Sequence, residues 1–148
     1  MAQSEEFSAL VPSPGTAQFV DVPAAPAPIG HYHHAVVLPG GFVQLSGQKA
    51  WRPEDGVLID GDVAAQTRLA LSNIGAVLAG LGLDYSNLTR LVCHLHDPAD
   101  YPAFNAAYSE ELGEAMPTRA VLAGAALRGG ALVEIIADAF DPRRAPDT

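Results

Sequence analysis

The sequence predicts a single α+β domain in which two helices pack on one face of a β-sheet. The length of 148 residues suits one domain with a core of its own. Strand-like and helical segments follow one another in the order β, β, α, β, α, β, β. A sheet covered on one face leaves the other face open, and symmetric association is one way to cover it.

The domain itself is expected over residues 29–142. Before it, residues 1–28 are rich in Pro, Ala and Ser, and the prolines are too closely spaced for the interior of a helix. They predict an extended N-terminal arm. Residues 143–148 are expected to form a short C-terminal tail.

Two short strands are predicted within residues 36–46, where the turn residues Pro39, Gly40 and Gly41 divide two β-prone runs. Residues 51–61 then contain turn residues and predict a loop. The chain therefore begins its sheet with a hairpin.

Two helices follow the hairpin. Asp62 can cap the first, because apolar or small residues then recur at alternating spacings of three and four as far as Leu81. After a predicted strand over 88–95, Asp97 and Pro98 are start signals for the second helix. Its buried side is predicted to be lined by Tyr101, Phe104, Tyr108 and Leu112.

The last two predicted strands cover residues 118–123 and 131–140. Both are rich in β-prone residues, and the loop 124–130 between them contains glycines. We expect them to pair as antiparallel neighbours.

The composition limits the kinds of partner. A net charge of −9 argues against nucleic acid or an anionic membrane, since both require a basic surface. No apolar run approaches the roughly 18 residues of a membrane span, and no secretory signal is visible. A single cysteine, Cys93, excludes an intramolecular disulfide. A cytoplasmic protein with a small-molecule partner is expected, and an anionic ligand would bind only through a local cation.

Arg119 and Glu134 are the first candidates for chemistry, because they lie on the last two strands and the loop between them could bring them together. Arginine offers a planar fork of donors that matches a carboxylate. Glu134 lies on an apolar strand, so it is paired, solvated at an edge, or functional. The two residues are interpreted either as a structural ion pair or as an anion site with an acid–base group.

Histidines gather in two places along the chain. His31, His33 and His34 form one group, and His94 and His96 form the other. A His-x-His pair on a strand aims both rings at one face, which suits a metal. No further ligand stands at a metal-binding spacing, so surface or loop histidines are the expected outcome and no metal is predicted.

Four other polar positions have both functional and structural interpretations. Tyr32 could donate a proton in a pocket or pack its ring. Cys93 lies in the middle of a predicted strand, where a buried thiol is usually inert. Ser46 and Asn105 could line a pocket or serve in caps and surface contacts.

From about Ile29 to Phe140, the chain resembles the Rid family, the reactive intermediate deaminases also called YjgF-like proteins. Each matching motif is modest, whereas their order and spacing together are specific. In chain order they are Ile29-Gly30-His31-Tyr32, Leu45-Ser46-Gly47-Gln48, the helical stretch 62–83, the segment 97–108 with Asn105 and Tyr108, Pro117-Thr118-Arg119 and Val133-Glu134-Ile135.

The resemblance implies a chorismate-mutase-like α+β fold, a homotrimer, and clefts between neighbouring subunits. Members that hydrolyse reactive imines and enamines need no metal or organic cofactor. By this resemblance Arg119 would bind the substrate carboxylate, Glu134 would position or activate water, and Tyr32 would line the cleft. Ser46 and Asn105 would be pocket or supporting groups.

Some positions differ from the family pattern. His31 stands where the family has proline, and His33 and His34 replace small or amide residues, which predicts a chemically altered rim of the cleft. Val121 stands where many members have cysteine, and Ile136 where a second glutamate often follows. These two predict a less polar wall.

Three functions therefore remain open. The first is hydrolytic deamination of 2-imino or enamino acids. The second is a specialised enzyme of a catabolic or biosynthetic pathway, acting on an aminomuconate-like or cyclic acyl compound and using His31, His33 or His34 as acid or base. The third is a regulatory protein that binds a small molecule without converting it, since a fold alone does not determine function.

Overall fold

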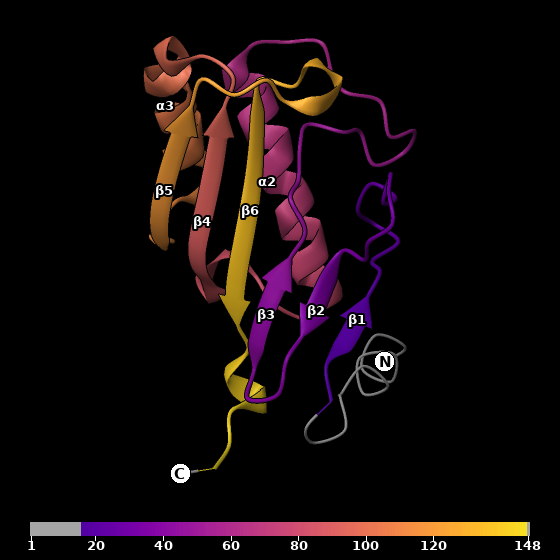
Figure 1. Ribbon diagram of the computed structural model, residues 1–148. Helices are drawn as coiled ribbons and strands as arrows, with labels where there is room; N and C mark the ends of the chain where they lie inside the picture. Colours follow the sequence, from indigo (N-terminus) through magenta and orange to yellow (C-terminus); the bar gives the residue numbers. More distant parts are fainter. Residues whose placement is uncertain (1–15, 148) are drawn as a thin grey trace.

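Two helices, α2 (Val63–Gly80) and α3 (Tyr101–Leu112), cover one face of a mixed six-stranded sheet in the computed structural model, which describes residues 16–147 (Figure 1). The strands are β1 (Gln18–Val20), β2 (Ala35–Val37), β3 (Phe42–Leu45), β4 (Leu88–Leu95), β5 (Thr118–Ala123) and β6 (Val133–Phe140). The predicted fold class is confirmed. The structure adds β1 to the predicted order of elements.

β4 lies between β5 and β6 in the sheet, whose strand order is β1-β2-β3-β6-β4-β5. The predicted pairing of 118–123 with 131–140 is therefore wrong. α3 carries the chain from the end of β4 back to the start of β5, so β5 pairs with β4 in parallel. The loop after β5 then passes the end of β4, and β6 pairs antiparallel with β4 and β3.

Part of the predicted N-terminal arm belongs to the sheet. β1 pairs antiparallel with β2, and Val20, Val22 and Ala25 are buried in the core. Residues 1–15 of the arm lie outside the described residues. The segment 16–28 thus contributes a strand and core side chains ahead of residue 29.

α2 begins as predicted. The Asp62 carboxylate accepts a hydrogen bond from the Ala65 backbone N–H at 2.9 Å and so caps the first turn. All the predicted core positions of this helix are buried, namely Val63, Thr67, Ala70, Ile74, Val77 and Leu81. Neither helix in the described part of the chain is long and apolar enough to cross a membrane.

α3 buries three of its four predicted positions, Phe104, Tyr108 and Leu112. Tyr101 was predicted on the same side and is instead 40% exposed. It stands in the first turn of the helix, at the edge of the sheet beside Arg119, to which its hydroxyl is hydrogen-bonded. A polar partner at the edge, rather than the core, accounts for this difference.

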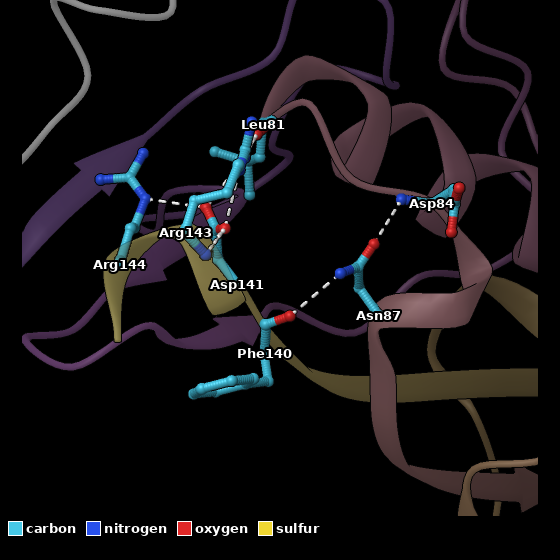
Figure 2. Close-up of polar contacts among 7 residues, drawn as sticks. All are labelled: Leu81, Asp84, Asn87, Phe140, Asp141, Arg143 and Arg144. Atoms are coloured by element: carbon cyan, nitrogen blue, oxygen red, sulfur yellow. Dashed lines mark hydrogen bonds and ion pairs between the residues drawn. The ribbon is translucent and has the colours of Figure 1, made fainter. Parts of the chain in front are cut away.

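Asp141 anchors the chain after β6 (Figure 2). Its buried carboxylate accepts hydrogen bonds from Nε of Arg143 at 2.8 Å and Nε of Arg144 at 2.9 Å. Arg143 also donates to the carbonyl of Leu81 at the end of α2, at 3.0 Å. Burial alone would raise the pKa of Asp141, but the hydrogen bonds from the two arginines hold it below its ordinary value. The start of the predicted C-terminal tail is therefore fixed to the domain.

We expect Asp141→Asn to lower the free energy of unfolding by about 2 kcal/mol, because the charge-assisted bonds to both arginines weaken. The folded-state pKa lies below the ordinary 3.8, so this stabilisation is present above 3.8 and is lost as the pH falls through the folded-state pKa. Urea unfolding of both proteins, from neutral pH down through 3.8, checks it. A difference that stayed constant down the series would contradict this account.

Candidate active site

Arg119 is held over an aromatic surface of α3 at the edge of the sheet. Its guanidinium carbon lies 4.8 Å from the centre of the Tyr108 ring, and 5.8 Å and 5.9 Å from the centres of the Tyr101 and Phe104 rings. Nη1 donates to Oδ1 of Asn105 at 2.8 Å, and Nη2 donates to the Tyr101 hydroxyl at 2.9 Å. One helix therefore supplies all of these contacts, and together they orient the guanidinium.

Arg119 also keeps donors for an anion. Within residues 16–147, no carboxylate forms an ion pair with this arginine. A guanidinium carries five N–H groups, and the bonds to Asn105 and Tyr101 occupy only part of them. The side chain is exposed and presents a cationic fork, so the arrangement suits a small carboxylate.

Glu134 lies beside a lysine and a glycine. Its Oε2 is 3.6 Å from Nζ of Lys49. Its Oε1 lies so close to the Gly47 backbone that a Cβ built on that glycine would be 2.6 Å away. Any larger residue at position 47 would displace the carboxylate, so the glycine of the Ser-Gly-Gln segment makes room for it.

Arg119 and Glu134 lie on opposite faces of the sheet. Arg119 is in register with Leu91 of β4, which is fully buried under the helices, whereas Glu134 is in register with His94. Side chains alternate along a strand, so Leu91 and His94 point to opposite faces. The interpretation of a structural ion pair between Arg119 and Glu134 is therefore wrong for a single chain.

Tyr32 lines a pocket of about 270 Å³ at the other end of the sheet, near β1 and β2. Tyr32 is 43% exposed, and its hydroxyl accepts a hydrogen bond from the backbone N–H of Ile29 at 3.2 Å. The lining residues are Asp21, Gly30, His31, Tyr32 and His33. Two of the three neighbouring histidines thus share a pocket with the tyrosine.

Asp21 and Ser46 hold His33 in place. Nδ1 of His33 lies 2.9 Å from Oδ2 of Asp21, and the second carboxylate oxygen accepts the backbone N–H of His34 at 3.2 Å. The hydrogen bond from His33 is the main cause that lowers the pKa of Asp21. The Ser46 hydroxyl donates to the carbonyl of His33 at 2.7 Å. Ser46 therefore fixes the backbone of the pocket rim.

His34 has a structural position outside this pocket. It is 2% exposed, its Nδ1 accepts the backbone N–H of Val22 at 2.8 Å, and its Nε2 lies 2.7 Å from the carbonyl of Pro26. These partners place the ring proton on Nε2. In the described part of the chain, His, Cys, Asp and Glu side chains form no group of three or more that could hold a metal ion.

Val121 of β5 and Cys93 of β4 are neighbours in register on adjacent strands. Val121, two residues beyond Arg119, packs partly buried against the core, so it lies on the same face as the arginine. Cys93 is fully buried, and burial raises the pKa of its thiol to about 12. The prediction of a buried thiol is confirmed.

The predictions from sequence missed Lys49, Tyr101 and Asp21 as contacts of the candidate residues. Lys49 could have been noticed, because it follows the Ser-Gly-Gln segment directly and is the only lysine in the chain. The roles of Tyr101 and Asp21 depend on which strands and helices become neighbours. No local pattern signals that.

Residues 22–140 match the family described as endoribonuclease L-PSP. A RutC family protein of Pyrococcus abyssi is 34% identical over 116 residues, which are 78% of this chain and 91% of that protein. The 2-iminobutanoate/2-iminopropanoate deaminase of Capra hircus is 35% identical over 118 residues, or 80% of this chain and 85% of that protein. The crystal structure of Escherichia coli TdcF with bound serine superimposes with a TM-score of 0.77 at 30% identity, covering 84% of this chain and 98% of that one.

We expect Cys93 to resist thiol-specific alkylation in the folded protein at mildly alkaline pH. The thiolate is the reacting form, and a pKa of about 12 together with complete burial leaves almost none of it accessible. Mass spectrometry after treatment with iodoacetamide, with and without denaturant, measures this. Rapid labelling without denaturant would show that the thiol is reactive after all.

Proposed function

Because the chain belongs to the YjgF/Rid family, we propose that it hydrolyses 2-imino and 2-enamino acids to 2-oxo acids and ammonia. The observation that carries this proposal is Arg119, a charged fork held by Asn105 and Tyr101 with no carboxylate partner in the described residues. Relatives 34% and 35% identical to this chain are named for deamination of 2-iminobutanoate and 2-iminopropanoate, both of which carry a carboxylate.

In the proposed reaction, Arg119 binds the substrate carboxylate and Glu134 accepts a proton from the attacking water. A protonated imine is electrophilic at C2 without further activation, so neither a metal nor an organic cofactor is required. The protein holds the anion, positions the water and excludes competing nucleophiles. Tyr32, His31 and His33 line the cleft.

Supporting residues complete the proposed site. Asn105 orients the guanidinium, and Ser46 fixes the rim of the Tyr32 pocket through the carbonyl of His33. Val121 forms an apolar part of the wall beside Arg119. These are the positions at which substrate size and polarity are expected to be selected.

The cleft is proposed to lie between subunits of a homotrimer. Arg119 is on the edge strand β5 and faces the helix side, whereas Glu134 faces the open side of β6, and Tyr32 lies near the opposite edge. One chain therefore does not bring them together. A second copy packed against the open face can supply the missing partner, which is the arrangement that the family resemblance implies.

RNA is a less suitable substrate, although the family description refers to an endoribonuclease. The net charge of −9 opposes binding of a polyanion, which normally needs several phosphate contacts from basic residues. A single exposed arginine in an aromatic setting fits one carboxylate better.

A specialised deaminase or related enzyme is the second candidate function. The observation that favours it is the Asp21–His33 pair in the Tyr32 pocket, because a carboxylate on Nδ1 leaves Nε2 free for proton transfer. His34 does not support this function, since both of its ring nitrogens have backbone partners. A protein that binds a small molecule without converting it is the third candidate function. Measured release of ammonia would exclude it.

We expect the protein to accelerate ammonia release from freshly generated 2-iminopropanoate and 2-iminobutanoate. Arg119→Ala should lower kcat/KM at least about a hundredfold through loss of positioning. Glu134→Gln should lower kcat by about 10² to 10⁴ through loss of the base. A coupled assay of ammonia measures both effects.

Arg68→Ala and Asp138→Asn serve as matched controls. Arg68 forms an ion pair with Glu110 on the helix surface, and Asp138 lies on the same strand and face as Glu134, paired with Arg90. Both should keep wild-type activity. Folded wild-type protein that gives no acceleration would remove the deaminase proposal and leave the specialised enzyme or the binding protein.

A mixing experiment tests the location of the cleft. Arg119→Ala and Glu134→Gln subunits, each inactive alone, are refolded together in equal amounts. If each cleft takes Arg119 from one subunit and Glu134 from its neighbour, random assembly should restore about one quarter of the wild-type rate. Restoration would not occur if both residues acted within one chain.

A further inference from the structure

Lys49 is an unusual residue in this chain. Of the eight lysine and arginine residues, it is the only lysine. Lysine is among the residues least often buried, yet Lys49 is 8% exposed. The one amine-bearing side chain of the protein is therefore placed inside it, next to Glu134.

The Lys49 amine has an ion-pair partner and an aromatic neighbour. Nζ lies 3.6 Å from Oε2 of Glu134, beyond the usual length of an N–H···O hydrogen bond. It lies 5.7 Å from the centre of the Trp51 ring, which shields one side. Asn73 of α2 donates hydrogen bonds to the carbonyls of Lys49 and Trp51, at 3.0 Å and 2.8 Å, so the backbone here is fixed.

Lys49 and Glu134 share the face of the sheet that no helix covers. Gln48 is in register with Ile135, and both are buried on the helix side. Glu134 points to the open side of β6, and the Lys49 amine lies on that side because its Nζ is 3.6 Å from Oε2 of Glu134. Glu134 keeps 27% of its side chain exposed and Lys49 keeps 11%, so the pair borders the surface proposed for the cleft.

The choice of lysine over arginine is chemically informative. Either residue would provide a positive charge beside Glu134, and this chain uses arginine at every other cationic position. Arginine does not lose its proton in proteins, whereas a lysine amine can, and then attacks carbonyl and imine carbons. A neighbouring carboxylate can accept that proton.

We propose that Lys49 is a covalent catalytic residue that forms a Schiff base with C2 of the substrate. This proposal rests on the proposed function. Glu134 accepts a proton from the Lys49 ammonium, and the amine lone pair forms a bond to C2 of the imine. Glu134 returns this proton to the substrate nitrogen and then transfers a second proton from Nζ to the same nitrogen. The C2–N bond breaks, ammonia leaves, and the Nζ lone pair completes the Schiff base.

The second half of the reaction restores the lysine. Water loses a proton to Glu134 and adds to C2 of the Schiff base. This proton passes from Glu134 to Nζ, the hydroxyl proton of the adduct passes to Glu134, and the C2–Nζ bond breaks to give the 2-oxo acid and the amine. The amine then regains its proton from Glu134. The sum is one imine and one water converted to one 2-oxo acid and one ammonia, with no oxidant or reductant.

The test is reductive trapping with pyruvate, the 2-oxo acid formed from 2-iminopropanoate. Full-length protein is incubated with pyruvate and sodium borohydride, which reduces a Schiff base to a stable secondary amine. Peptide mass mapping should locate one reduced adduct on Lys49. The α-amine of the chain is the other amine present, and mapping separates it from Lys49.

Three variants complete the experiment. Lys49→Arg keeps the charge and Lys49→Met keeps most of the length, and both should lose the adduct and the ammonia release while staying folded by circular dichroism. Arg68→Ala should keep both. No adduct on Lys49 in active wild-type protein, or full activity in Lys49→Arg, would overturn the proposal and leave the lysine as an ion-pair partner of Glu134.

The two proposals fail in different ways. If ammonia release is observed without trapping, the deaminase function stands and the covalent role of Lys49 does not. If trapping on Lys49 is observed without ammonia release, the Schiff base stands and the substrate is a carbonyl compound rather than an imine.

Discussion

The position of β4 between β5 and β6 is the constraint on which the site depends. A parallel β4–β5 pair requires a crossover, and α3 provides it. The same helix then lies under the edge strand and supplies the rings and polar groups that hold Arg119. β6, antiparallel to β4, turns Glu134 to the other face. The strand order thus places Arg119 and Glu134 on opposite faces of the sheet.

The face of the sheet that no helix covers carries exposed apolar side chains. Phe42, Leu122 and Ile136 are exposed there in the single chain. The Lys49–Glu134 pair lies near Ile136, two residues along β6 from Glu134. Exposed apolar side chains gathered on one face are typical of interaction surfaces. Two observations therefore support the proposed subunit contact. It would bury the exposed apolar side chains, and it would bring Arg119 of one subunit near Glu134 of another.

Local patterns predicted the elements and nonlocal pairing determined the rest. The spacing of apolar residues and the Asp62 cap were enough for α2, because both signals lie within the helix itself. The pairing of β5 was mispredicted because a short loop suggests neighbours, yet the sheet order depends on where α3 returns the chain. Tyr101 was misplaced for the same reason, since its partner Arg119 is distant in sequence.

For the candidate site, the family resemblance pointed to Arg119, Glu134 and Asn105 as candidates, and the geometry adds what each one touches. Arg119 and Asn105 are joined directly, which a spacing of 14 residues across two elements does not reveal. Only the structure shows that His33 and His34 have different surroundings. His33 pairs with Asp21 at a pocket, whereas His34 is buried between Val22 and Pro26. Sequence treats these adjacent histidines alike.

Charge gives a final reason to regard recognition as local. The net charge of −9 would repel an anionic substrate at long range, but ions screen such fields over about 8 Å at physiological salt. Within that distance a carboxylate would meet the exposed guanidinium of Arg119, whose hydrogen-bond partners are an amide and a phenol rather than carboxylates. Under the proposed function, affinity for a carboxylate would come from contact geometry rather than from steering. A polyanion gains little from one such contact, whereas a small 2-imino acid needs only one.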